Sequence, residues 1–344
     1  VDAERASGFR YGQRAFLVQI RREGAGTWLI DPEPLRDLSI INDALSGVEW
    51  ILHASTQDLP CLSELGMWPD KLFDTELAAR LAGLPRVGLA AVIENLLGFS
   101  LAKEHSAADW STRPLPEPWL RYAALDVEVL AELREELIKL LEADGKLAFA
   151  EEEFEAIRTA DPAPPRTDPW RRTSGMHQLR DRRQLAAVRE LWQEREQLAE
   201  RRDTAPGRLI PDAAIVAAAR AMPSTVPQLL STPGFHGRAA HKEAPRWLRC
   251  TAAARATKDL PPLHTPTNPP PPPRVWARND PAAAARLHTA KPRLAALADR
   301  LNMPVENLLP PDHLRRLAWR PPAVIDLDTI TAALRGLGAR EWQI

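Results

Sequence analysis

The sequence predicts an α/β domain with a mixed sheet, followed by two small all-α domains. Strand-like and helix-like patterns alternate over residues 1–158, whereas residues 170–255 and 281–344 contain only helical patterns. Proline-rich stretches at 160–169 and 260–274 separate these segments, because proline lacks an N–H and has a fixed φ angle. A length of 344 residues also fits two or three domains of ordinary size.

In the first segment, apolar runs predict strands and amphipathic patterns predict helices. The expected elements are strands over 15–20, 27–30 and 48–53, a hairpin turn at 23–26, and helices over 35–45 and from 117 past 141. The chain opens in strand-like sequence at Asp2-Ala3-Glu4. We therefore expect a first strand that continues upstream of Val1 and is truncated in this numbering.

The two later segments show apolar residues at helical spacing throughout, which is typical of small bundles. The expected helices are 180–202 and 212–221, then 282–301, 305–308, 312–319 and 326–337. Between the bundles, the run Pro269–Pro273 predicts an extended polyproline II spacer, with an SH3 or WW ligand as the alternative interpretation.

The formal net charge of -1 conceals a strong asymmetry along the chain. Residues 1–158 carry a net charge of -12 and residues 159–344 a net charge of +11. Such asymmetry suggests a polyanionic partner for the basic part, although Arg and Glu side chains on solvated helix faces explain part of it. The sequence contains no apolar run long enough to span a membrane, and its two cysteines lack metal-type spacing, which favours a reducing cytoplasm.

Four carboxylates and one tyrosine of the acidic segment are candidates for a catalytic site. Asp2 and Glu4 share one face of the first strand, because side chains alternate with a period of two. Asp58 stands at the start of a helix, where an ordinary Asp favoured by the helix dipole is the alternative interpretation. Tyr122 and Asp126 are spaced i,i+4 on one helix face, where a purely structural hydrogen bond is the alternative.

If these four carboxylates converge, cations must balance their mutual repulsion. Hard oxygen ligands suit Mg²⁺ or Mn²⁺, and the absence of cysteine or paired histidine ligands disfavours zinc. Two divalent cations about 3.5–4 Å apart can activate a water molecule and stabilise the leaving oxygen of a phosphodiester. The residues therefore predict two-metal phosphoryl-transfer chemistry.

The order of these motifs resembles the DEDD superfamily of 3′-5′ exonucleases, in its Tyr-bearing branch. Three further stretches are similar to the ribonuclease D family: Phe73-Asp-Thr-Glu-Leu-Ala-Ala79, Asp109-Trp-Ser-Thr-Arg-Pro-Leu115 and Tyr122-Ala-Ala-Leu-Asp-Val127. The resemblance implies a ribonuclease H-like exonuclease domain over 1–158. It further implies an HRDC domain over 170–255 and a second, more diverged HRDC-like domain over 281–344, of the kind seen in actinobacterial members.

By the same resemblance, Asp2, Glu4, Asp58 and Asp126 are expected to bind metal. Tyr122 is expected to orient the attacking water, and His53 to contact the nucleotide. The implied activity is 3′-5′ exoribonucleolytic release of nucleoside 5′-monophosphates from single-stranded 3′ ends.

The implied substrates are tRNA precursors and other structured RNAs, and we expect a cytoplasmic monomer with no membrane partner. A catalytically inert RNA-binding scaffold and a DNA-directed 3′-5′ exonuclease are the alternatives, since two-metal chemistry does not itself sense the 2′-hydroxyl.

Overall fold

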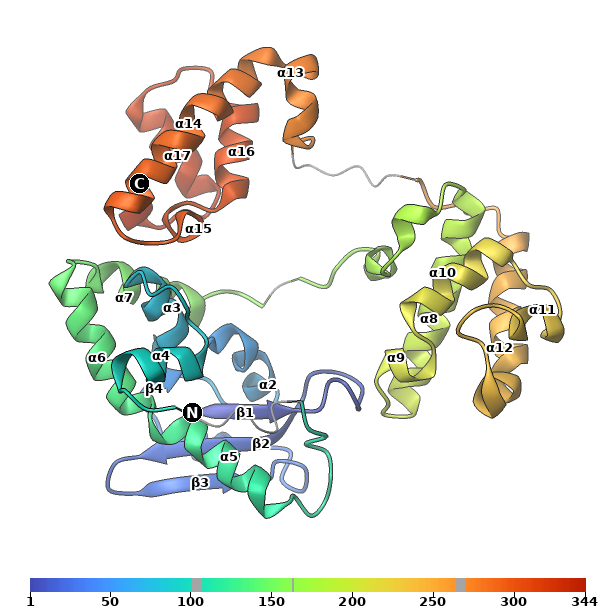
Figure 1. Ribbon diagram of the computed structural model, residues 1–344, viewed down its shortest axis with the longest axis horizontal. Helices are drawn as coiled ribbons and strands as arrows, with labels where there is room; N and C mark the ends of the chain where they lie inside the picture. The colour runs from blue at the N-terminus through green and yellow to red at the C-terminus, as the bar shows by residue number, and fades with distance from the viewer. Residues whose placement is uncertain (101–106, 163, 264–269) are drawn as a thin grey trace.

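The computed structural model describes residues 1–100, 107–162, 164–263 and 270–344. It has an α/β part followed by two helical parts, so the fold class predicted from the sequence is confirmed (Figure 1). The expected polyproline spacer begins at Pro269, which lies outside the described residues. No described helix is long and apolar enough to cross a membrane.

Five short strands build the sheet structure of the first part. They are β1 (Asp2–Arg5), β2 (Ala15–Arg22), β3 (Gly26–Ile30), β4 (Glu49–Leu52) and β5 (Lys71–Asp74). β1, β2 and β3 pair antiparallel in that order, whereas β4 and β5 pair parallel. The backbone nitrogen of Val1 donates a 2.9 Å hydrogen bond to the carbonyl oxygen of Ile51 in β4. Parallel and antiparallel pairs are therefore both present, and this bond brings the start of β1 beside β4.

Helices cover the strands of this part. They are α1 (Ser39–Ala44), α2 (Leu59–Ser63), α3 (Thr75–Leu81), α4 (Leu89–Leu96), α5 (Glu117–Glu128), α6 (Leu130–Ala143) and α7 (Leu147–Arg158). The prediction of one helix from residue 117 past 141 is wrong, since the helix is interrupted at Val129. α5 packs on the three-stranded sheet and buries Ala123 near Leu17, whereas α6 buries Leu133 and Leu137 in the main core. The interruption lets two successive helices bury different faces.

The second part is a helical domain with a core of its own. Its helices are α8 (Arg182–Arg201), α9 (Pro206–Leu209), α10 (Asp212–Ala221), α11 (Val226–Leu230) and α12 (Gly237–Ala256). α8 packs against both α10 and α12, and Leu191, Ile215 and Trp247 are buried between them. This packing follows from the helical spacing of the apolar residues.

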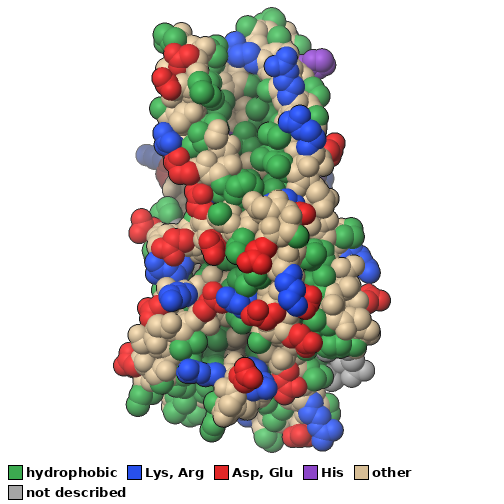
Figure 2. All heavy atoms as spheres, turned by 90° about the vertical axis from the view of Figure 1, so that its left-hand side faces the viewer, with side chains coloured by type: hydrophobic (Ala, Val, Ile, Leu, Met, Phe, Trp, Pro, Cys, Tyr) green, Lys and Arg blue, Asp and Glu red, His purple; other side chains and the backbone are tan. Residues whose placement is uncertain are grey.

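The third part is helical too, but its packing depends on the first part. Its helices are α13 (Trp276–Asn279), α14 (Pro281–Arg300), α15 (Val305–Leu308), α16 (Pro311–Trp319) and α17 (Leu327–Gly336). Its separate buried cluster is small, whereas Ala298, Met303 and Leu308 are buried within the core of the first part. In Figure 2 this domain lies above the α/β part, whose visible surface is dense in acidic side chains.

Polar contacts reinforce the joint between the first and third parts. Lys146 is buried, and its Nζ donates to the carbonyl oxygens of Leu81 at 2.9 Å and Asn302 at 3.2 Å. The ring of Trp342 stacks on that of Phe149, with centroids 4.8 Å apart. The carboxyl-terminal domain is thus attached to the α/β domain by both apolar and polar contacts.

The second part contacts the loop between β1 and β2. Arg14 donates two 2.8 Å hydrogen bonds to the carboxylate of Asp203, and Nε of Arg208 donates to the carbonyl oxygen of Gly8 at 2.7 Å. The α/β domain therefore contacts both helical domains. Its contact with the second part is made by the loop that follows β1.

Candidate active site

The first two candidate ligands lie on β1. Asp2 and Glu4 alternate with Ala3, which is buried in the core, so the two carboxylates share the opposite face of the strand. β1 pairs with β2 with Asp2 opposite Gln19 and Glu4 opposite Leu17. The pairing with the longer strand holds both carboxylates in place.

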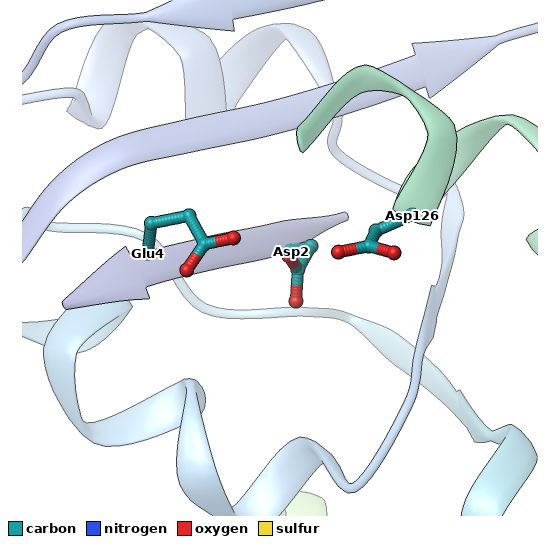
Figure 3. A group of neighbouring side chains, drawn as sticks. All are labelled: Asp2, Glu4 and Asp126. Atoms are coloured by element: carbon teal, nitrogen blue, oxygen red, sulfur yellow. The ribbon is translucent and has the colours of Figure 1, made fainter. Parts of the chain in front are cut away.

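α5 brings two more predicted residues to this face. Carboxylate oxygens of Asp2, Glu4 and Asp126 lie within 4.8 Å of one another. Figure 3 shows Asp2 between the other two, with the Asp126 side chain extending from the helix toward β1. The Tyr122 hydroxyl hydrogen-bonds to Asp126, as the i,i+4 spacing allows. The structure therefore brings together residues that are more than 100 positions apart in the chain.

Asp58 joins the site from the turn that follows β4. It occupies the position before the first residue of α2, yet its side chain makes no capping hydrogen bond to that helix. Instead the carboxylate is buried, hydrogen-bonds to Asp2 and lies 3.6 Å from Nη2 of Arg5. The interpretation of Asp58 as an ordinary helix-start residue is thus weaker than the local sequence suggests.

Hydrogen bonds to a neighbouring aspartate shape the turn that carries Asp58. The Asp74 carboxylate accepts hydrogen bonds from the backbone nitrogens of Ala54 at 3.1 Å and Ser55 at 2.7 Å. It also caps α3. His53, at the end of β4, has its Nδ1 2.9 Å from the Thr75 hydroxyl oxygen, and burial lowers its pKa. His53 is therefore held beside the site, close enough to Asp2 to act on it electrostatically.

Burial raises the pKa of all four carboxyl groups. The pKa rises to about 9 for Glu4, about 8 for Asp58 and about 7 for Asp126, and repulsion from Asp2 is the next cause in each case. The pKa of Asp2 itself is raised by burial. A cation placed among these groups would favour their ionised forms.

The donor set fits a hard divalent cation. Asp2, Glu4 and Asp126 offer only oxygen ligands, and within the described ranges this is the one such cluster of three or more potential ligand residues. Carboxylate oxygens suit Mg²⁺ or Mn²⁺, whereas zinc is usually held by cysteine or histidine as well. The three carboxylates therefore offer a ligand set that suits a hard divalent cation.

Two residues near the site did not emerge from the sequence patterns. Gln19 is completely buried opposite Asp2, and neither of its side-chain polar atoms has a hydrogen-bond partner among the described residues. Arg5 is the cation beside Asp58. Gln19 could have been found from the sequence, because it is a polar residue within the otherwise apolar run Ala15–Ile20. Arg5 could not, because an arginine at the end of a strand is common and indicates no particular function.

Family comparisons assign three regions of the chain. Residues 1–142 match a family described as 3'-5' exonuclease, and residues 184–251 match the HRDC domain. Residues 269–344 match a family described as 3' to 5' exonuclease C-terminal domain.

Curated relatives are named ribonuclease D. The protein from Granulibacter bethesdensis is 32% identical over 295 residues, which cover 83% of this chain and 71% of the relative. The Escherichia coli protein is 32% identical over 250 residues, covering 69% of this chain and 66% of the relative.

Solved structures share the arrangement over nearly the whole chain. A protein from Bifidobacterium adolescentis has a TM-score of 0.89 and 40% identity, covering 99% of this chain and 88% of that one. Escherichia coli RNase D, described as an exoribonuclease involved in structured RNA processing, has a TM-score of 0.69 and 26% identity. It covers 98% of this chain and 91% of its own.

Proposed function

The chain belongs to the ribonuclease D family and is a 3′-5′ exoribonuclease, and we propose that it hydrolyses phosphodiesters with two metal ions held by Asp2, Glu4, Asp58 and Asp126. The observation that supports this site most is the approach of three carboxylates within 4.8 Å, beside a tyrosine hydroxyl. Family members depend on metal. The number of ions and the choice of Mg²⁺ or Mn²⁺ are part of the proposal.

The protein residues position the reacting groups. Two divalent cations would supply a nucleophile at neutral pH and stabilise the leaving 3′-oxygen. Burial raises the pKa of Tyr122, which favours the protonated hydroxyl, a hydrogen-bond donor. Its role in the proposal is to orient the attacking water while Asp126 holds the hydroxyl in place. Hydrolysis at the terminal linkage would release a nucleoside 5′-monophosphate.

The substrate is proposed to be a single-stranded RNA 3′ end, such as that of a tRNA precursor or another structured RNA. His53 is proposed to contact the terminal nucleotide from the end of β4. The net charge of +11 over residues 159–344 supports RNA binding by the HRDC domain and by the third domain, which we propose to be a second HRDC-like module. Backbone contacts of this kind weaken steeply with salt.

The setting proposed for this reaction is the cytoplasm, with the protein acting as a monomer. Cys61 and Cys250 are buried free thiols, which are typical of a reducing compartment. Light scattering of the purified protein measures its molar mass in solution and so tests whether it is a monomer.

The test is digestion of a 3′-end-labelled single-stranded RNA with Mg²⁺, with Mn²⁺ and with excess chelator. We expect labelled mononucleotide with either metal and intact RNA with chelator. The Asp58→Asn variant should leave the RNA intact, whereas Asp43→Asn, an exposed carboxylate of α1, should retain activity. The rate of digestion of a DNA of the same sequence, compared with that of the RNA, measures the preference for a substrate with 2′-hydroxyl groups. Full activity of Asp58→Asn, or activity in chelator, would refute the two-metal assignment.

A further inference from the structure

Arg5 is a cation of the active site that the catalytic roles above leave unused. Its guanidinium lies 3.6 Å from Asp58, and its side chain is 26% exposed, compared with 7% for that of Asp58. This distance exceeds that of a hydrogen bond, and no hydrogen bond from the Arg5 side chain reaches any described residue. An arginine has five N–H donors, so most of the binding capacity of Arg5 is free.

Arg5 lies between the carboxylates and an open hollow of the surface. It is the last residue of β1 and directly follows Glu4, at a point where the pairing with β2 shifts in register. Glu4 and Arg5 together line an open hollow of about 420 Å³, with the loop Ala6–Phe9, Gln13 and the segment Ala107–Ala108 as its other walls. A register shift of this kind re-aims the side chains beside it, so Arg5 need not follow the alternation that places Asp2 and Glu4.

The charges of the site leave a role for one more cation. Arg5 is the one Lys or Arg side chain among the electrostatic causes acting on Asp2, Glu4 and Asp58, within the described part of the chain. Four ionised carboxylates are neutralised by two divalent cations, but a bound phosphodiester then adds a further negative charge. A guanidinium suits that charge, because its planar fork can donate two hydrogen bonds to a phosphate.

We propose that Arg5 binds a phosphate of the RNA 3′ end, and that its place 3.6 Å from Asp58 is the resting position of this side chain before metal and RNA bind. This proposal rests on the proposed function of the site. In the resting position the positive charge of Arg5 opposes the binding of a second cation at Asp58. With a divalent cation held by Asp58, the guanidinium would turn toward the hollow that it lines and donate to a phosphate there.

The test measures metal binding and RNA binding separately. The variant Arg5→Gln keeps the length and polarity of the side chain but removes its charge, and Arg5→Lys keeps the charge but removes the fork. Binding of Mn²⁺ is followed by calorimetry without RNA. Binding of RNA is followed by fluorescence anisotropy of a labelled oligonucleotide with Ca²⁺ in place of Mg²⁺, over a range of salt concentrations. Arg121→Ala, which removes an exposed arginine of α5 paired with Glu117, is the matched control.

Opposite changes are expected in the two measurements. In Arg5→Gln, Mn²⁺ should bind about 3- to 10-fold more tightly, since the positive charge beside Asp58 is gone. RNA should bind about 10- to 100-fold more weakly, and the slope of log affinity against log salt should decrease by about 0.7, the value for one phosphate contact on a single strand. Arg5→Lys should restore the salt slope and part of the affinity. Arg121→Ala should match the wild type in Mn²⁺ affinity, in RNA affinity and in the salt slope.

A purely structural role for Arg5 predicts a different result. It would lower the thermal stability of Arg5→Gln without tightening Mn²⁺ binding or changing the salt slope, and this outcome overturns the proposal. If Arg5→Gln does not fold, Arg5→Lys provides the test instead. Wild-type RNA affinity together with a wild-type salt slope in Arg5→Lys would refute a two-hydrogen-bond contact between the guanidinium and a phosphate. Wild-type protein that fails to shorten RNA would refute the proposed function, whereas active wild type with unchanged Arg5 variants refutes the present inference alone.

Discussion

Asp126→Asn is expected to stabilise the metal-free protein at high pH while removing its activity. The folded-state pKa of Asp126, about 7, exceeds its ordinary value of 3.8, so the folded protein binds more protons and loses stability as pH rises from about 4 to about 7. Since a tenfold change in proton affinity is about 1.4 kcal/mol, ionising Asp126 in the empty site costs on the order of 4 kcal/mol. Asparagine avoids this cost.

The assay is thermal unfolding at pH 5 and pH 8 in chelator. At pH 5 the variant should unfold only a few degrees above the wild type, because only about 1.6 kcal/mol of the cost has accumulated there. At pH 8 the variant should unfold on the order of 10 °C higher, given about 2–4 °C per kcal/mol for a domain of this size. Adding Mg²⁺ at pH 8 should then stabilise the wild type more than the variant. RNA digestion should be slower in the variant by about 10²-fold or more, because a metal centre contributes several kcal/mol to transition-state stabilisation.

The control is Asp43→Asn, which removes a carboxylate exposed on α1. It should follow the wild type at both pH values. If wild type and Asp126→Asn lose the same stability between pH 5 and pH 8, then the charge of Asp126 is not disfavoured in the folded protein. The acidic cluster would then need no cation to balance the charge of Asp126.

Three further changes test other parts of the structure. Tyr122→Phe should lower kcat by about 10²-fold with Mn²⁺ affinity unchanged, because the hydroxyl orients water in the proposal rather than binding metal; a wild-type kcat would exclude that role. Gln19→Met should raise the free energy of unfolding in chelator by about 1–3 kcal/mol, because it removes a buried amide without hydrogen bonds; a loss of stability in urea unfolding would contradict the packing described. Trp342→Ala should destabilise the joint with the third domain by about 2 kcal/mol, since it removes the stack on Phe149; limited proteolysis should then cleave the chain faster, and an unchanged cleavage rate would show that the stack contributes little.

Much of the local structure could be predicted from the sequence. The hairpin of β2 and β3, the helices of both bundles and the i,i+4 pair of Tyr122 and Asp126 follow from short-range patterns. Those patterns depend on propensity and periodicity, which act over a few residues. They could not predict the interruption at Val129, because both helices beside it have apolar stripes and only the packing partners decide where each stripe faces.

The same limit applies to the carboxyl-terminal domain. Its apolar residues were expected to form a separate bundle core, and their helical spacing is the same whichever core they enter. In the structure Ala298, Met303 and Leu308 are buried with residues of the α/β domain. Long-range packing therefore decides which core a helix belongs to.

The sequence by itself determined the order of the motifs and the alternation that puts Asp2 and Glu4 on one face, because these depend on neighbours along the chain. Only the tertiary structure decided that Asp58 faces Asp2 instead of capping α2, and that Arg5 lies beside it. These relations join segments more than 50 residues apart, and folding of the whole domain sets the distances between them. These distances matter for the chemistry, because the pKa of a carboxyl group depends on the charges and the burial around it in space.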